Sequence, residues 1–432
     1  GLSVRLALST QPLLTRPTYT PFVRSESALH NLVSFPLDHL KPDTDYYYAL
    51  EVNGRLDRTK RGQFRTFPAG AASFTFAYAS CARTASTSSV FDSIREDHPL
   101  FFMNIGDFHY EDIAAADPAR FRAAYDFVLS SPQQADLYRS TPFVYVWDDH
   151  DYGGNNANRR AKSHTAARIA YDEYVPHYPL GCGTNAGPIC QTFNVGRVKF
   201  ILTDLRSERD PITNRDDAEK TMMGTWQKEW FKNELLQANG KYPLICWVSS
   251  VPWIGTKGSN YYRVGTNVYG YLNHTNLTNS PSSRSRLRPG GRPPGSEEDH
   301  WSAYTTERRE IADFIKSNHI QGVCILHGDS HMLAADDGRY SDYATGGGAP
   351  LPVMCAAPLD QEPSLKGGPY SQGVYRVNYR NREGAFGLVR VTDRGDRIQV
   401  HFSGRNRWNE EKITLDFAVP ATAPSPVPVP AK

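Results

Sequence analysis

Long apolar runs are missing from this chain of 432 residues, and so is a strong excess of charge of one sign. No stretch of about 18 apolar residues occurs, so the sequence predicts no membrane-spanning helix. The 48 basic and 46 acidic residues nearly cancel, which removes the electrostatic case for a nucleic-acid platform. The most basic stretch, 283–292, is interleaved with Gly, Pro and Ser and indicates a solvated loop. No signal peptide is recognisable, and Gly1 in place of Met is typical of a processed or trimmed protein.

Cysteine is scarce, with six residues of two kinds. Cys182 and Cys190 bracket a loop rich in Gly, Asn and Pro, a spacing that a disulfide could close; two free loop thiols are the alternative. Cys246, Cys324 and Cys355 lie in apolar runs, where we expect inert buried side chains. A disulfide favours an oxidising setting, so we expect a secreted, periplasmic or cell-envelope-facing protein.

Three short polar runs each follow an apolar stretch of the kind that forms a strand. They are Gly106-Asp107-Phe108-His109-Tyr110, Trp147-Asp148-Asp149-His150-Asp151 and His327-Gly328-Asp329-Ser330-His331. The loops after strand ends are where α/β folds present reactive groups. Because each run carries Asp together with His or Tyr, the pattern predicts oxygen and nitrogen ligands that converge on metal ions.

Three regions are expected along the chain. Residues 1–70 alternate in short strand-like pieces, and 40–48 resemble the tyrosine corner of a fibronectin type III-like β-sandwich. Residues 71–415 form the catalytic domain, interrupted by a flexible insertion at 256–299 that is rich in Gly, Ser, Asn, Arg and Pro. Residues 416–432 form a Pro-rich tail.

Within the larger region, strand-like and helix-like patterns alternate and predict packed sheets flanked by helices. Helices are expected at 90–96, 118–129, 164–175, 226–236 and 305–315. Strands are expected at 74–79, 100–105, 143–146, 243–249 and 323–326, with hairpins at 193–202 and 386–402.

Four segments in this order resemble the alkaline phosphatase D (PhoD-type) family, a branch of the calcineurin-like metallophosphoesterases. They are Ala79-Ser80-Cys81-Ala82-Arg83-Thr84, 106–111, 147–153 and Gly328-Asp329-Ser330-His331, and the likeness covers roughly residues 72–405. The resemblance implies an α/β fold, a four-layer αββα sandwich preceded by the small all-β domain. It also implies hydrolysis of phosphate monoesters or diesters, with phospholipase D activity in some relatives, and a ferric ion together with calcium.

The resemblance and the ligand chemistry together suggest which residues hold the ions. Asp107, Tyr110, Cys81 and His331 would hold one Fe³⁺, because phenolate and thiolate ligands stabilise ferric iron. Asp149 and Asp329, with Asn156 as a weaker candidate, would hold one or two Ca²⁺ through oxygen. Many calcineurin-like enzymes have Asp-x-His where this chain has Ser80-Cys81-Ala82, so zinc or manganese is less favoured.

Other residues receive supporting roles. His150 is expected to donate a proton to the leaving group or to contact phosphate, and Arg83 to clamp phosphate oxygens. Asp148 is expected to orient His150 or a ligand, while His109 is given a place beside the ligands although a packing role is favoured. Candidates for a lid over the substrate are Trp253, for which packing is the favoured alternative, His300 and Trp301.

These expectations combine into a metal-dependent phosphoester hydrolase in which a metal-bound hydroxide or oxide attacks phosphorus in line. No phosphoenzyme is expected, because no activated nucleophile with a separate base is visible. One alternative is a phosphodiesterase of the phospholipase D type. Another, from a different class, is a carbohydrate- or surface-binding protein whose metal site is vestigial.

Overall fold

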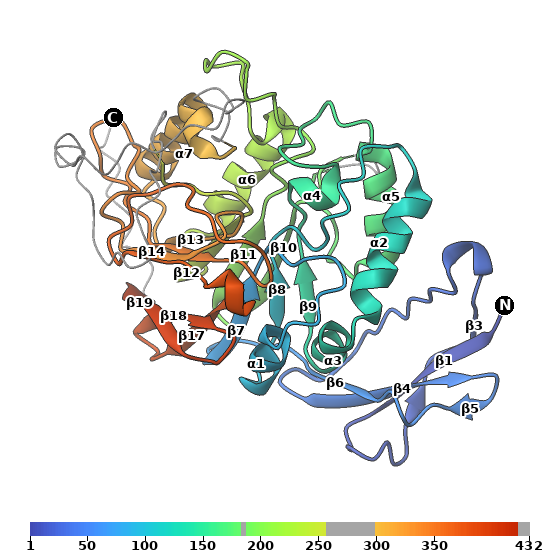
Figure 1. The fold of residues 1–432 in the computed structure, drawn as a ribbon. Coiled ribbons are helices and arrows are strands. Elements are labelled where there is room, and N and C mark those ends of the chain that lie inside the picture. Colours follow the sequence, from blue (N-terminus) through green and yellow to red (C-terminus); the bar gives the residue numbers. More distant parts are fainter. Residues whose placement is uncertain (183–186, 256–298, 422–432) are drawn as a thin grey trace, which may run out of the picture.

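The computed structural model describes residues 1–182, 187–255 and 299–421 (Figure 1). Most of the insertion expected at 256–299 and residues 422–432 of the expected tail therefore lie outside the described residues. None of the helices in the described ranges is long and apolar enough to cross a membrane.

Residues 1–70 form one sheet, unlike the two facing sheets of the expected fibronectin type III-like sandwich. Its strands are β1 (Ser3–Ser9), β2 (Thr18–Tyr19), β3 (Val23–Arg24), β4 (Asp45–Val52), β5 (Arg55–Leu56) and β6 (Gly62–Arg65), with a short 3-10 helix at Ser27–Leu29. β2 and β3 pair with β1, and β5 and β6 pair with β4, so the short strands extend the two long ones instead of building a second sheet. The corner at 40–48 is present, since the Lys41 N–H donates to Tyr46 Oη at 3.0 Å.

The N-terminal sheet packs against the catalytic region beside helices α2 (Pro118–Ser130) and α3 (Pro132–Ser140). Tyr48 Oη donates to the Arg139 carbonyl at 3.1 Å, and His30 Nδ1 lies 2.5 Å from Asp126 Oδ2. A cleft of about 760 Å³ lies between the two parts, lined by residues such as Phe64, Arg95 and Pro142. It sits where the parallel strands of the catalytic region begin.

Two sheets build the catalytic region. One contains β7 (Phe74–Ala79), β8 (Phe102–Asn104), β9 (Phe143–Tyr145), β17 (Ala385–Asp393), β18 (Arg397–Asn406) and β19 (Glu411–Pro420) in the order β19-β18-β17-β7-β8-β9. The other contains β10 (Gln191–Val195), β11 (Val198–Leu202), β12 (Leu244–Ser249), β13 (Val323–His327), β14 (Leu333–Asp336), β15 (Val353–Ala356) and β16 (Val374–Tyr375) in the order β10-β11-β12-β13-β15-β14-β16. β7, β8 and β9 run parallel in the first sheet, as do β11, β12, β13 and β15 in the second.

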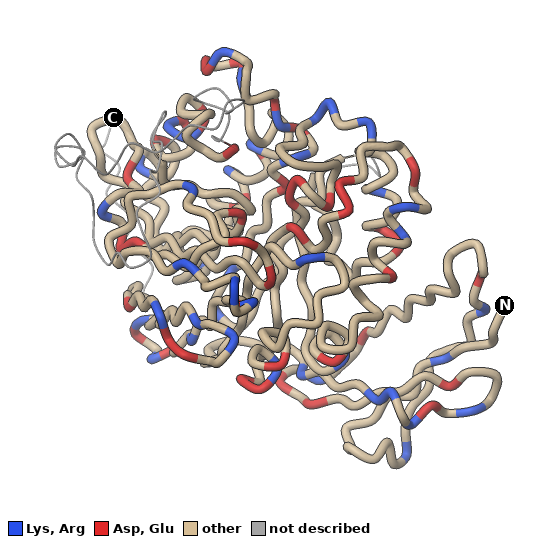
Figure 2. The backbone as a smooth tube through the Cα atoms, in the orientation of Figure 1, with Lys and Arg blue, Asp and Glu red and all other residues tan. Residues whose placement is uncertain are grey.

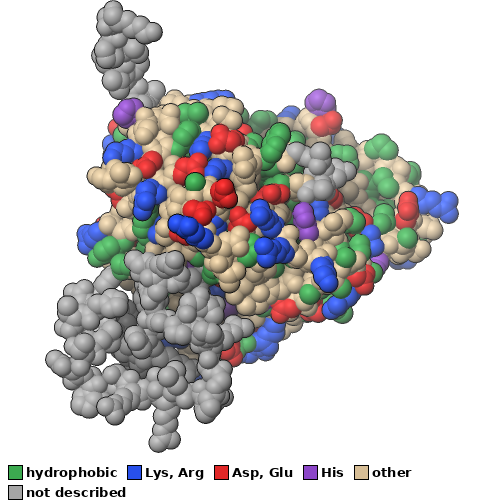
Figure 3. Space-filling view, turned by 90° about the horizontal axis from the view of Figure 1, so that it is seen from above, with side chains coloured by type: hydrophobic (Ala, Val, Ile, Leu, Met, Phe, Trp, Pro, Cys, Tyr) green, Lys and Arg blue, Asp and Glu red, His purple; other side chains and the backbone are tan. Residues whose placement is uncertain are grey.

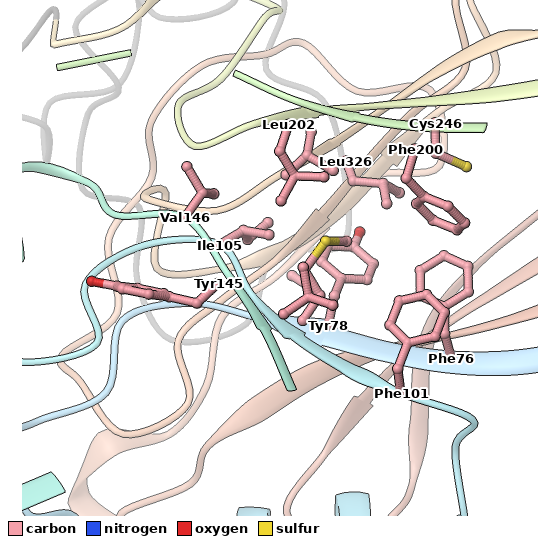
Figure 4. Packing of buried hydrophobic residues seen from close by; sticks show 14 of the residues in the cluster. Phe76, Tyr78, Phe101, Ile105, Tyr145, Val146, Phe200, Leu202, Cys246 and Leu326 are labelled. Atoms are coloured by element: carbon pink, nitrogen blue, oxygen red, sulfur yellow. The ribbon is translucent and has the colours of Figure 1, made fainter. Parts of the chain in front are cut away.

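The main hydrophobic core fills the space between these two sheets. Phe76 of β7 stacks on Phe101, with ring centroids 5.0 Å apart, and meets Phe200 of β11 edge-on at 5.3 Å. Figure 4 shows these rings with Leu202 and Leu326 from the second sheet. Alternating apolar residues of both sheets thus interdigitate, and their burial supplies the main favourable free energy of the fold.

Helices cover the outer faces of both sheets. α1 (Val90–Glu96) and α3 pack on the first sheet through a cluster that includes Phe91, Leu137 and Phe102. α6 (Gly224–Ala238) and α7 (Thr305–Ser317) pack on the second through a cluster that includes Phe231 and Ile311. α2 and α5 (His164–Tyr174) add side chains to the central core. The remaining described helices are α4 (Asp149–Tyr152) and 3-10 turns at Trp301–Ala303 and Tyr379–Asn381.

The expected boundary of the tail at 416 is corrected by β19, which pairs with β18 as far as Pro420. Its alternating residues, with Ile413 and Leu415 buried, complete the edge of the first sheet. The cysteine pair behaves as its spacing predicts, because Cys182 and Cys190 form a disulfide with Cα atoms 6.0 Å apart.

Candidate metal centre

The candidate ligands lie where four parallel strands end. Cys81 follows β7, Asp107 follows β8, Asp149 follows β9 at the start of α4, and Asp329 and His331 follow β13. The carboxyl ends of neighbouring parallel strands meet at one edge of a sheet. Because the two sheets face each other, residues from both arrive at the same place, and acidic positions gather around α4 in Figure 2.

One group of possible ligand atoms comes from Cys81, Asp107 and His331, which lie within 4.8 Å of one another. Tyr110 joins them, since its hydroxyl donates to Asp107 Oδ2 at 2.8 Å and lies 3.0 Å from His331 Nε2. The His331 Nδ1 is 2.5 Å from the Glu362 carbonyl, to which it donates, so Nε2 keeps its lone pair on the Tyr110 side. All four residues expected to hold iron are therefore brought together.

Two further groups overlap with the first. Asp107, Asp149 and His150 form one, and Asp148, Asp149 and Asp329 form the other, each within 4.8 Å. Asp107 belongs to two groups and so does Asp149, so neighbouring ions would share carboxylates. The arrangement fits two adjacent cation positions.

Two buried oxygens in these groups have no hydrogen-bond partner in the described part of the chain. They are Asp149 Oδ1 and Asp329 Oδ2. A buried carboxylate oxygen without a partner costs free energy, and a cation removes that cost. The donor set of carboxylates, phenol, thiol and imidazole is therefore suited to hold metal ions.

Several of the candidate ligands share an uncommon backbone conformation. The φ angles of Cys81, Asp107, Asn156, Asp329 and His331 are all positive, between 50° and 64°. Side chains other than Gly adopt this region at a cost, and it is enriched at functional sites where the surroundings enforce it. The tight bend after each strand turns its side chain inward.

Without a bound cation, the negatively charged forms of the candidate ligands are unfavourable in this buried site. Burial and the neighbouring Asp149 carboxylate raise the pKa of Asp107 well above its ordinary range. Burial also raises the pKa of the Cys81 thiol and of the Tyr110 hydroxyl, in both cases with help from Asp107. A bound cation reverses this tendency, because it stabilises the deprotonated forms that serve as ligands.

Arg206 pairs with Asp148 and Asp299 and was not identified from the sequence. Its Nε and Nη2 donate to Asp148 at 2.6 and 2.9 Å, and its Nη1 donates to Asp299 at 2.6 Å. Ser250 Oγ donates to Asp148 at 2.7 Å. Asp148 is thus paired and fixed beside Asp149, and its expected role in orienting His150 or a ligand stays a prediction. Arg206 lies in the polar run that follows β11, another parallel strand, and that position is the signal that could have found it.

A loop at 359–366 ties three candidate ligands together and was also missed. The Asp360 N–H donates to the Cys81 carbonyl at 3.2 Å, the Glu362 carbonyl receives His331, and Lys366 Nζ donates to Asp329 Oδ1 at 2.6 Å. Lys366 offsets part of the acidic charge, yet burial still raises the pKa of Asp329 to about 6. No sequence pattern marks this loop, because its contacts form only in the folded chain.

His150 lies next to the first group, that of Cys81, Asp107 and His331, and its ring is placed where it can donate a proton. Its ring contacts that of Tyr110 in a tilted arrangement with centroids 4.1 Å apart, and its Nδ1 lies 2.5 Å from Asp112 Oδ1. Burial alone would lower the pKa of His150, but Asp107 and Asp112 outweigh it and raise the pKa to about 10. Asp112 is a further residue that sequence reasoning missed.

Arg83 and Asn156 lie at the edge of the site. The Arg83 side chain is 43% exposed and donates to the Tyr379 hydroxyl. Asn156 contributes its backbone, whose N–H donates to Asp149 Oδ2 at 2.6 Å. The expected role of the Asn156 amide as a calcium ligand stays a prediction.

Comparison with known proteins agrees with this geometry. The profile of the PhoD-like phosphatases matches residues 76–395. The chain belongs to the PhoD-like phosphatase family. Alkaline phosphatase D of Bacillus subtilis (strain 168) is 23% identical over 358 residues, which is 72% of this chain and 55% of that protein. The chain therefore spans little more than half the length of this curated relative. A solved structure of PhoD shares the fold, with a TM-score of 0.72, 17% identity and coverage of 98% of this chain and 84% of that one.

Four other residues of this PhoD-like chain lie in packing environments. His109 contacts the rings of Phe121 and Tyr125 rather than the candidate ligands. Trp253 and Trp301 are fully buried and meet edge-on with centroids 5.3 Å apart. The lid interpretation is therefore wrong for both tryptophans, because buried rings behind the second sheet cannot close over a substrate. His300 is also buried, and its side chain accepts a hydrogen bond from the Ser302 N–H.

Proposed function

We propose that this protein hydrolyses phosphate esters at a centre of two kinds of metal ion. The observation that carries the proposal is the overlap of three ligand groups around Asp107 and Asp149, together with the two unpartnered carboxylate oxygens. Membership of the PhoD-like phosphatase family supports it. The curated relative is named as an alkaline phosphatase, and the layered packing is compatible with the αββα sandwich of the predicted family.

The candidate ligands form two sets, one for each kind of ion. Cys81, Asp107, Tyr110 and His331 would hold Fe³⁺, and Asp149 and Asp329 would hold Ca²⁺. When bound, such ions supply Lewis acidity toward phosphate oxygens and an activated water. The protein supplies the remaining functions through its own side chains.

His150 is the proposed acid. Its hydrogen bond to Asp112 favours the protonated ring, which can donate a proton to the departing oxygen. Asp112 holds the ring at Nδ1, which leaves Nε2 as the donating atom. Arg83, half-exposed at the edge of the site, binds phosphate oxygens.

The location is proposed to be outside the cytoplasm or at the cell envelope. The disulfide between Cys182 and Cys190 supports this proposal, because disulfides persist mainly in oxidising compartments. On the face that Figure 3 shows, acidic and basic side chains of the described residues are interspersed, so a small phosphoester is favoured over a nucleic acid as partner.

The test combines metal analysis of the purified protein with turnover of p-nitrophenyl phosphate and bis(p-nitrophenyl) phosphate. We expect iron and calcium and release of nitrophenol, and the ratio of the two rates separates monoesterase from diesterase activity. Asp149→Asn should abolish turnover, whereas Asp396→Asn, an exposed surface aspartate, should not change it. A protein that carries its metals but turns over neither ester would reject the proposal and revive a binding role.

A further inference from the structure

Arg83 and Arg382 lie near the candidate metal centre, and both contact the same buried carboxylate, that of Asp360. Asp360 is fully buried and accepts from Ser86 Oγ at 2.6 Å. Arg382 Nη2 lies 3.4 Å from Asp360 Oδ2, and Arg83 Nη2 lies 3.8 Å from Asp360 Oδ1. The two guanidinium groups therefore share one counter-charge; Arg382 donates to Asp360 Oδ2, and Arg83 donates to the Tyr379 hydroxyl.

This cluster carries an excess of positive charge. The side chains of Arg83 and Arg382 are 43% and 54% exposed, so both present N–H groups to solvent. Arg407 Nη1 donates to the Arg382 carbonyl at 3.3 Å and brings a third guanidinium close. The neighbouring Glu383 does not pair with them, because it is buried and its oxygens accept from other groups, namely Tyr375 Oη, Asn378 N and Asn406 Nδ2.

The cluster is attached directly to the ligand loops. Arg83 is two residues beyond Cys81, and Ala82 pairs with Asp360 in an isolated β-bridge. The neighbouring Thr84 Oγ1 accepts from the Tyr110 N–H at 2.9 Å. Arg83 is therefore carried by the loop that holds the candidate ligand Cys81, and Asp360 places Arg382 beside it.

We propose that Arg382, which lies beside Arg83 on Asp360, forms a subsite for a second anionic group of the substrate, a carboxylate or a second phosphate on the alcohol side of the scissile ester, while Arg83 contacts the scissile phosphate. Guanidinium forks match the two oxygens of such groups, and the buried Asp360 holds Arg382 in place. The inference rests on the proposed hydrolysis and adds to it the class of substrate: phosphoesters whose leaving group is itself negatively charged.

The test compares phenyl phosphate with 3- and 4-carboxyphenyl phosphate by phosphate release. At least one carboxylated ester should have a kcat/KM about tenfold higher, since hydrogen bonds to charged groups are of this strength. Arg382→Gln should remove that preference and Arg382→Lys should restore part of it. Arg380→Gln, an exposed arginine of the same loop, should leave the preference intact.

A binding measurement keeps this inference separate from the proposed hydrolysis. Phenylphosphonate and the carboxyphenylphosphonates cannot be hydrolysed, and calorimetric titration of the metal-loaded protein should show the same tenfold preference. Hydrolysis without any preference, or equal loss of preference in Arg380→Gln, would overturn the subsite and leave the hydrolase standing. Absence of hydrolysis, with a preference in binding that depends on Arg382, would support the subsite and reject the hydrolase.

Discussion

Two buried charged clusters lie side by side in this molecule and differ in how their charges are balanced. In the cluster of Arg206, Arg209, Asp148 and Asp299, each carboxylate meets a guanidinium at 2.6 Å or less. In the two overlapping groups that contain Asp107, Asp149 and Asp329, carboxylates crowd together, and two of their oxygens have no hydrogen bond within the described ranges. Burial is the same in both. In the first, the carboxylates pair with arginines, whereas in the second Lys366 pairs with Asp329 Oδ1 and the oxygens Asp149 Oδ1 and Asp329 Oδ2 are left for a cation.

The largest effect is expected when the unbalanced group loses a carboxylate. Asp107→Asn removes a shared ligand, so turnover should fall by about a thousandfold or more. The metal-free protein should become more stable, because burial and the neighbouring Asp149 carboxylate raise the pKa of Asp107 in the ion-free site and so disfavour its charged form. Activity assays and urea unfolding in chelator would measure the two effects. Unchanged activity would remove Asp107 from the centre.

The second prediction compares two cysteines: Cys81, which lies among the candidate metal ligands, and Cys246, which lies in the hydrophobic core. Cys81→Ala should fold but lose iron, the visible absorption expected of a ferric thiolate–phenolate site, and most activity. Cys246, whose Sγ is 3.7 Å from Cys324 Sγ, behaves as a small apolar residue, so Cys246→Ala should keep all three. Metal analysis and absorption spectra would decide. A variant without Cys81 that retained its iron and colour would contradict the thiolate role.

Breaking the balanced cluster should affect stability more than chemistry. Arg206→Gln leaves Asp148 buried without its guanidinium partner and Asp299 with Arg209 alone, which should cost about 3–5 kcal/mol of unfolding free energy. Activity should also fall, since Asp148 adjoins Asp149. Denaturant unfolding would measure the loss. Arg397→Gln, at a pair that is 50% exposed on the arginine side, should cost less than about 1 kcal/mol, and equal losses would refute the distinction.

The smallest effect is expected at the surface ion pairs of α6 and α7. Burial would raise the pKa of Glu310, but hydrogen bonds from Lys228 and Lys232 lower it below its ordinary value of 4.5. A lowered pKa in the folded state adds stability above the ordinary value, and this is lost as the pH falls through the folded value. Glu310→Gln should therefore cost about 0.5 kcal/mol at pH 7 and nothing at pH 3. A difference that persisted at pH 3 would contradict the electrostatic origin.

Elements with a clear apolar pattern were predicted from the sequence, and several elements without one were not. α1 occupies 90–96 as predicted, and β7 occupies 74–79, because strong apolar periodicity defines both. β14, β15 and β16 were not predicted, since strands of two to four residues exist only through pairing with neighbours. The helix α3 was missed as well, although Pro132 at its first turn is a recognisable start signal.

Residue types at strand ends, together with the resemblance to the PhoD-type family, selected Cys81, Asp107, Asp149, Asp329 and His331 as candidates, and parallel strands deliver their carboxyl-end loops to one edge. Their grouping around shared carboxylates, and the support from Arg206, Asp360 and Lys366, were decided by the tertiary structure. These supports lie far from the ligands in sequence, so only the face-to-face packing of two sheets brings them into contact. The buried tryptophans illustrate the same limit: an aromatic residue near a loop has the same sequence signature whether its ring faces a substrate or the core, and Trp253 and Trp301 face the core.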